Sequence, residues 1–177
     1  MLPNNILAFI ALANEYCSAL ETAAESQPYD FTGNMLRLLP RLYISATDLR
    51  KSPEVMSRID EPSYLESALD EDYYDSVRRS VEGLLGEHDT YLEVFEEDMK
   101  YSDTPIAANV SEGLSDLFQV FFNFLDMVRE APEEVTLDAV AAVSSDFESY
   151  WGQILCNVMR PLHQIYYQLI TPADNSY

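Results

Sequence analysis

The sequence predicts an all-α fold, an irregular bundle of about five to seven helices that ends in a long, kinked C-terminal helix. Three observations predict it. The 177 residues include five glycines, apolar residues recur at intervals of three and four along most of the chain, and this period holds for about 33 residues at the C-terminal end. With 47% hydrophobic residues, the chain can bury one core, so we expect residues 1–177 to form a single helical domain.

The first two helices are predicted from capping residues and apolar spacing. Asn4 or Asn5 can cap a first helix that ends before Pro28. A second helix begins near Phe31 with a broad apolar face, and Pro40 should kink it because proline removes a backbone hydrogen bond. The apolar line of the first helix consists of Ile6, Ile10, Ala13, Cys17, Leu20 and Ala24.

The middle of the chain mixes weak and strong signals. Residues 51–69 have no sustained period and predict a loop with a short helix around Tyr64–Ala68. A third helix opens at the acidic residues 70–72, which suit the positive end of the helix dipole, and stops at Gly86. The pair Thr104–Pro105 is typical of a helix start, and Ser111 is an alternative start for the same heavily aromatic helix.

The last helix is predicted to start at Thr136 and to run to Leu169. Pro161 should distort it. Tyr150 and Trp151 fall on this helix, where a packed aromatic core is the simplest interpretation and solvent exposure would instead favour a recognition role.

The net charge of −21 limits the partners of the protein. A surface of this sign repels a phosphate backbone and lacks the Lys and Arg clusters that bind anionic lipids, so we expect no direct nucleic-acid binding and no membrane association. Between Asp60 and Asp103, 15 acids stand against three basic residues, a net of −12. This acidic region is either a solvated face or a docking surface for a basic partner or cations.

Two cysteines, Cys17 and Cys156, lie among apolar neighbours, and we expect both to be buried reduced thiols of a cytoplasmic protein. The apolar run of residues 6–14 imitates a signal-peptide core, but no basic residue precedes it, so we expect no secretion. The sequence shows no apolar stretch of the ~20 residues that cross a bilayer.

Residues 86–105, GEHDTYLEVFEEDMKYSDTP, are the densest polar stretch and the candidate site. His88 either bonds to local backbone or acts as a general base held by Glu87 or Asp89. Tyrosines such as Tyr91 bridge core and solvent or line a recognition surface. The candidate ligand or interaction residues are Glu87, His88, Asp89, Tyr91, Asp103 and Trp151.

Neither a metal site nor a catalytic site is indicated by this stretch. It contains no Glu-x-x-His pair, no zinc-ligand spacing and no EF-hand loop, so we predict no metal and no cofactor. Ser111 and Cys17 do not stand in a nucleophile motif. The sequence therefore favours a non-catalytic protein over an enzyme.

Two segments resemble a bacterial family of small proteins recorded as a domain of unknown function. They are LGEHDTYLEVFEEDMKYSDTPIAANVSEGLSDLFQ and FESYWGQILCNVMRPLH, and the similarity extends over most of the chain. The resemblance implies an all-helical, cytoplasmic bacterial protein and implies no activity.

These observations lead to two hypotheses. The first is a non-catalytic cytoplasmic helical protein whose acidic face docks a basic protein partner. The alternative is a small-molecule or cation-binding protein, or an enzyme, with a site at residues 87–105 that folds over the last helix near Tyr150 or Trp151. A mimic of DNA charge is a third possibility, which requires acids spaced like phosphates on one surface. The oligomeric state stays open.

Overall fold

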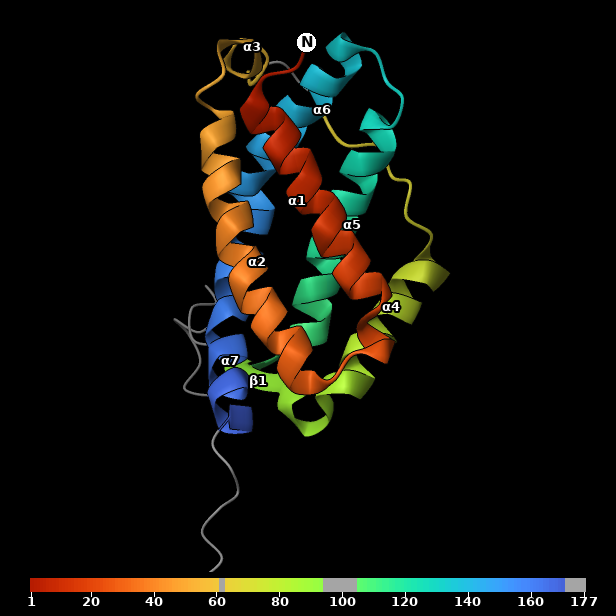
Figure 1. The fold of residues 1–177 in the computed structure, drawn as a ribbon, viewed down its shortest axis with the longest axis vertical. Coiled ribbons are helices and arrows are strands. Elements are labelled where there is room, and N and C mark those ends of the chain that lie inside the picture. Colours follow the sequence, from red (N-terminus) through yellow and green to blue (C-terminus); the bar gives the residue numbers. More distant parts are fainter. Residues whose placement is uncertain (61–62, 94–104, 171–177) are drawn as a thin grey trace, which may run out of the picture.

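The fold comes from a computed structural model that describes residues 1–60, 63–93 and 105–170. The predicted all-α bundle with a long, irregular C-terminal helix is confirmed, and a two-stranded sheet is added to it (Figure 1). The elements in chain order are α1 (Asn4–Glu21), η1 (Ala23–Glu25), α2 (Pro28–Leu49), α3 (Pro53–Met56), α4 (Glu71–Leu85), η2 (Gly86–Asp89), β1 (Thr90–Glu93), β2 (Ile106–Asn109), α5 (Val110–Val128), α6 (Glu133–Asp146), η4 (Phe147–Trp151) and α7 (Gly152–Ile170).

An aromatic cluster joins α1, α5 and the C-terminal rod, which consists of α6, η4 and α7, at the centre of the bundle. Trp151 is fully buried, with ring centroids of Phe121 and Phe9 at 5.1 and 6.2 Å, and its indole N–H donates to the carbonyl of Val143 at 2.9 Å. Full burial of each such ring stabilises the fold by roughly 1.5–3 kcal/mol. Because the indole N–H has an acceptor, its burial carries no penalty for a lost hydrogen bond.

The helices of the N-terminal half differ from the prediction in two places. Asn5 does not cap α1, and its amide ties α1 to the end of α2 by donating to Asp48 O at 2.9 Å and Ser52 Oγ at 2.8 Å. The short helix predicted at Tyr64–Ala68 is wrong, because the backbone N–H groups of Ala68 and Leu69 donate to the side chain of Asn123 instead.

The helix start predicted at Thr104–Pro105 is also wrong. Residues 106–109 form strand β2, which pairs antiparallel with β1, and α5 starts at Val110 beside the alternative start at Ser111. Thr104 lies outside the described residues. The reason is a pairing between segments that are distant in sequence, which a local capping signal cannot register.

The C-terminal rod starts at Glu133, three residues before the predicted Thr136, and its irregularity lies at the π-helical segment η4. Helix α7 continues through Pro161. Among the residues on which burial was predicted, Cys17 is buried, whereas Cys156 is exposed and Tyr150 is 48% exposed. Apolar neighbours in the sequence therefore did not determine the burial of these two side chains.

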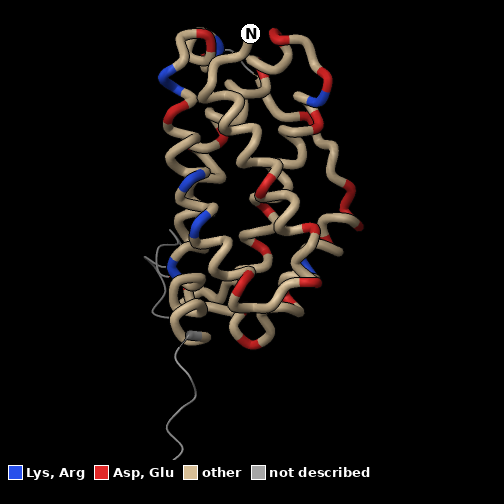
Figure 2. The backbone as a smooth tube through the Cα atoms, in the orientation of Figure 1, with Lys and Arg blue, Asp and Glu red and all other residues tan. Residues whose placement is uncertain are grey.

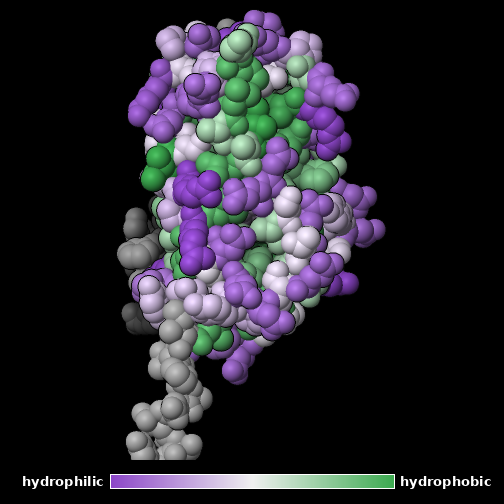
Figure 3. Space-filling model, in the orientation of Figure 1, coloured by the Kyte–Doolittle hydropathy of each residue, from purple (hydrophilic) through white to green (hydrophobic). Residues whose placement is uncertain are grey.

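The face in Figure 3 is mostly hydrophilic, with its hydrophobic side chains gathered over the upper half of α1. Leu7 of that helix is 47% exposed. Of the described helices, none is long and apolar enough to cross a membrane.

Candidate functional site

The polar stretch begins where Gly86 ends α4. Gly86 has a φ of 56°, a left-handed conformation that costs glycine little, and its N–H donates to Glu82 O. The chain then makes the single turn η2 and enters β1. This turn leads the backbone from α4 into β1, which lies beside α7 at one end of the molecule (Figure 1).

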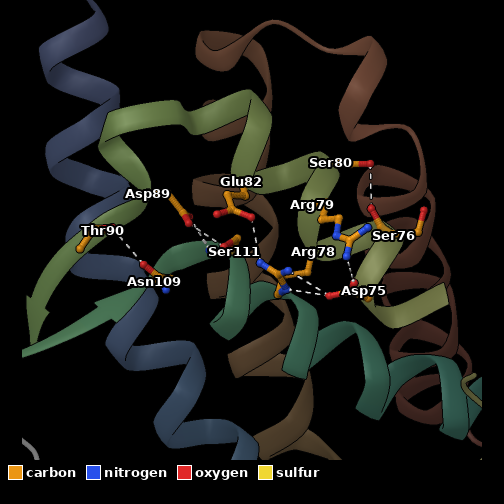
Figure 4. A network of polar contacts seen from close by, with 10 residues as sticks. All are labelled: Asp75, Ser76, Arg78, Arg79, Ser80, Glu82, Asp89, Thr90, Asn109 and Ser111. Carbon is orange, nitrogen blue, oxygen red and sulfur yellow. Dashed lines mark hydrogen bonds and ion pairs between the residues drawn. The ribbon is translucent and has the colours of Figure 1, made fainter. Parts of the chain in front are cut away.

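Asp89 is the buried member of this stretch. Its side chain is 4% exposed, and its two carboxylate oxygens accept hydrogen bonds from the backbone N–H and the hydroxyl of Ser111, each at 2.7 Å (Figure 4). Ser111 is the second residue of α5, so Asp89 satisfies a free N–H of the helix end from a different segment of the chain. Asp89 therefore anchors η2 to α5, and both of its oxygens are occupied by that role.

The hairpin of β1 and β2 places the next side chains. Thr90 opposes Asn109, and the Thr90 hydroxyl donates to Asn109 Oδ1 at 3.0 Å. Tyr91 and Leu92 follow on alternate faces of the strand. Glu93 is 3% exposed and accepts a hydrogen bond from the Tyr91 hydroxyl at 3.2 Å.

A groove of about 380 Å³ lies between the polar stretch and α7. Arg160 joins its two sides, because its guanidinium donates to the carbonyl of Leu92 at 2.6 Å and lies 5.7 Å from the ring centroid of Tyr91. The remaining lining comes from the polar stretch and from three turns of α7: Glu87, His88, Thr90, Pro161, Gln164, Ile165 and Gln168.

The six predicted site residues are thus divided among different parts of the structure. Glu87, His88 and Tyr91 line the groove, Asp89 anchors α5, and Trp151 lies in the core. Asp103 falls outside the described residues. The polar stretch does lie over α7, but at Arg160–Gln168 rather than at Tyr150 and Trp151.

Sequence reasoning missed Arg160, Gln164 and Gln168, which line the groove from α7. Their spacing of four residues puts them on one face of a helix, and this line of polar side chains was the available signal. Among the described residues, no three His, Cys, Asp or Glu side chains gather closely enough to hold a metal ion.

A second feature is an acidic surface formed by six carboxylates around α4. Within the described part of the chain, none of the six forms an ion pair. The arginines of α4, Arg78 and Arg79, pair with Asp75 and Glu82 of the same helix at 2.8–2.9 Å (Figure 4). Much of the remaining basic charge lies along α2 (Figure 2). The acidic surface comprises Glu21, Asp70, Glu71, Asp72, Glu112 and Asp116.

Two tyrosines connect the acidic surface to the core. The hydroxyl of Tyr73 donates to Glu21 at 2.5 Å, and that of Tyr74 donates to Asp116 at 2.6 Å. Burial and the bonded carboxylate raise the pKa of Tyr73 to about 12 and raise that of Tyr74 further. Burial also raises the pKa of Asp116 above its usual value, with a smaller contribution from Glu112.

Comparison with known proteins identifies the family. The model of the family described as "Domain of unknown function (DUF5063)" matches residues 1–168. The chain belongs to this family. It is also similar to a crystal structure of protein BF1032 from Bacteroides fragilis, with 27% identity, a TM-score of 0.76 and coverage of 97% of this chain and 96% of that one. No curated protein matches the chain.

The match confirms the predicted resemblance to an uncharacterised family. Since the family description assigns no activity, the function has to be inferred from the surfaces of this DUF5063 chain itself.

Proposed function

We propose that this protein is a non-catalytic docking protein whose acidic surface binds a basic protein partner. The observation that carries the proposal is the set of six carboxylates around α4 without an ion pair among the described residues. Exposed carboxylates without a paired cation attract basic groups, and together they would steer a basic partner toward this side of the molecule.

The aromatic residues of the same surface support the proposal. Tyr73 and Tyr74 are half-buried, and each holds a carboxylate by a short hydrogen bond. Tyrosine is enriched in protein interfaces because it combines apolar area with a polar group. The bonds also restrict Glu21 and Asp116, which lowers the entropy that those side chains lose when a partner binds. We further propose a cytoplasmic location, supported by the two free thiols.

The experiment measures binding of a fluorescent octalysine peptide as the concentration of salt is varied. The test variant is Glu71→Gln with Asp72→Asn, which removes two charges from the first turn of α4. The control, Glu54→Gln with Glu133→Gln, removes two charges from the first turns of α3 and α6, away from the acidic surface, so both variants lose the same net charge.

We expect the test variant to bind the peptide about 2- to 30-fold more weakly, because an exposed charge pair contributes about 0.2–1 kcal/mol. The control should bind like the wild type, and wild-type affinity should fall steeply with salt. Equal weakening in both variants, or binding that does not respond to salt, would contradict docking at the acidic surface. The same pair of variants can then be used to pull partners from the native cell.

The groove between β1 and α7 supports a second candidate function, the binding of a small molecule or cation. The observation in its favour is the meeting of Glu87, His88 and Arg160 around one concave space. Purified protein and His88→Ala should be screened by thermal shift against metals, nucleotides and common metabolites. A midpoint rise that His88→Ala abolishes supports this function. A large loss of melting temperature in His88→Ala without ligand indicates a structural role for His88 instead.

A further inference from the structure

A second groove lies between α2 and the junction of α6 and α7, apart from the polar stretch and the acidic surface. Its volume of about 410 Å³ is in the range of sites that hold small molecules. Three of its lining residues come from α2, Arg50 directly follows that helix, and the others come from residues 147–156, the segment FESYWGQILC. The lining residues are Tyr43, Ala46, Thr47, Arg50, Phe147, Glu148, Gly152, Gln153 and Cys156.

The π-helical segment η4 shapes this groove. Its wider turn places Trp151 in the core while Phe147 faces the groove, with their ring centroids 4.5 Å apart. A Cβ on Gly152 would lie 2.5 Å from the carbonyl oxygen of Phe147 and 3.0 Å from its ring, so this position needs glycine. Tyr43 meets Phe147 edge to face, with centroids 5.0 Å apart. The result is an aromatic wall, and π-helical turns of this kind are frequent at functional sites.

The groove is also lined by one cationic side chain, Arg50, and one anionic side chain, Glu148. Arg50 donates from Nη2 to the carboxylate of Glu148 at 2.6 Å and from Nε to the hydroxyl of Ser144 at 3.4 Å. The side chains of Arg50 and Glu148 are 38% and 71% exposed. Glu148 can therefore leave Arg50 without breaking up the core, and the ion pair itself is exposed and weak.

We propose that this groove binds a zwitterion with an apolar side chain, an aromatic α-amino acid. Its carboxylate binds Arg50, its ammonium group binds Glu148, and its ring lies against Phe147 and Tyr43. A zwitterion neutralises both Arg50 and Glu148. A ligand with only a carboxylate would place that negative charge beside Glu148, and a ligand with only an amine would place its positive charge beside Arg50. This function goes beyond partner docking and uses a different surface.

Cys156 provides a direct readout of groove occupancy. It lines the groove and is exposed, whereas Cys17 is buried, so a disulfide reagent added to the folded protein reports on Cys156. The probe is L-phenylalanine, and the matched compounds are phenethylamine, which lacks the carboxylate, and 3-phenylpropionate, which lacks the ammonium group. At ten times its Kd, L-phenylalanine should slow the thiol reaction roughly 11-fold by mass action, and the other two compounds at the same concentration should slow it less than about 2-fold.

Two variants test whether Arg50 and Glu148 bind the charged groups of the ligand. Arg50→Gln and Glu148→Gln should each abolish the protection by L-phenylalanine, while Arg41→Gln, on α2 but paired with Glu15, should keep it. Circular dichroism establishes that each variant is folded before it is scored. Absence of protection at about 10 mM L-phenylalanine would overturn the proposal, because a Kd above this concentration would be weaker than specific sites usually show. So would equal protection by phenethylamine or 3-phenylpropionate, or full protection in both charge variants.

Discussion

Replacing Asp89 by alanine tests whether the polar stretch contributes to the stability of the fold. The change removes both acceptors of Ser111 and leaves a helix N–H and a hydroxyl buried without those partners. Ser111 is 1% exposed and Asp89 is 4% exposed, so water cannot replace the lost acceptors without opening the structure.

The magnitude follows from the two hydrogen bonds. A hydrogen bond to a charged group contributes about 1.5–3 kcal/mol, and we expect Asp89→Ala to lower the free energy of unfolding by about 3–5 kcal/mol after partial relaxation. Total stabilities are about 5–15 kcal/mol, so this loss is a large part of the whole. For a chain of this length it corresponds to a midpoint that is roughly 6–20 °C lower.

The assay is urea unfolding followed by circular dichroism of the helices, with three companion variants. Asp89→Asn keeps an acceptor and should cost about 1–2 kcal/mol. Ser111→Ala keeps the backbone bond but removes the hydroxyl bond to the carboxylate, and should cost about 1.5–3 kcal/mol. Glu87→Ala, in the same turn but exposed, should stay within about 0.5 kcal/mol of the wild type.

A loss of less than about 1 kcal/mol in Asp89→Ala would refute the reasoning. It would mean that α5 starts without this cap, and that the contact of η2 with α5 does not contribute to folding.

The remaining predictions concern glycine, titration and thiols. Gly152→Ala should lower the free energy of unfolding by about 1–3 kcal/mol through overpacking, whereas Gly83→Ala, with no atom near its added Cβ, should raise it by about 0.5–1 kcal/mol; urea midpoints compare the two. Burial raises the pKa of Asp116 above 3.8, so the folded state holds this proton more tightly, and the associated stability is present at low pH and lost as the pH rises through the folded pKa. Asp116→Asn should therefore lose less stability than the wild type as the pH rises from 3.8 to neutral, and parallel pH profiles would contradict this. Cys156 should react with a disulfide reagent in the folded protein, and Cys17, whose pKa burial raises to about 12, should react only after unfolding, as a titration of thiols with and without urea will show.

The sequence predicted those parts of the fold whose signals are local. Helix α4 has an acidic start, a 3.6-residue period and a stop at Gly86, and it lies within a residue of the prediction. The strand at 106–109 was missed because its partner is β1, 13 or more residues earlier, and because the Thr104–Pro105 signal favours a helix on local grounds alone.

The sequence predicted which segment carries the candidate site, but not how its side chains are arranged in space. Residue types identified the polar stretch, yet nothing in the sequence separates Asp89, which faces α5, from His88, which faces α7. Trp151 was included among the candidate residues although a packed aromatic core was the simplest interpretation, and its full burial agrees with that interpretation. The π-helical turn that contains it has no clear sequence signature.

The buried indole also makes the molecule its own spectroscopic reporter. The chain has one tryptophan, and Phe9 of α1, Phe121 of α5 and Phe147 of η4 surround it. Its emission therefore comes from one position, where the N-terminal helix, the aromatic helix and the C-terminal rod meet. A red shift of the tryptophan emission reports the separation of those three elements. The far-ultraviolet circular dichroism signal reports the loss of helical backbone structure. Coincidence of the two transitions would establish that the bundle unfolds in a single cooperative step.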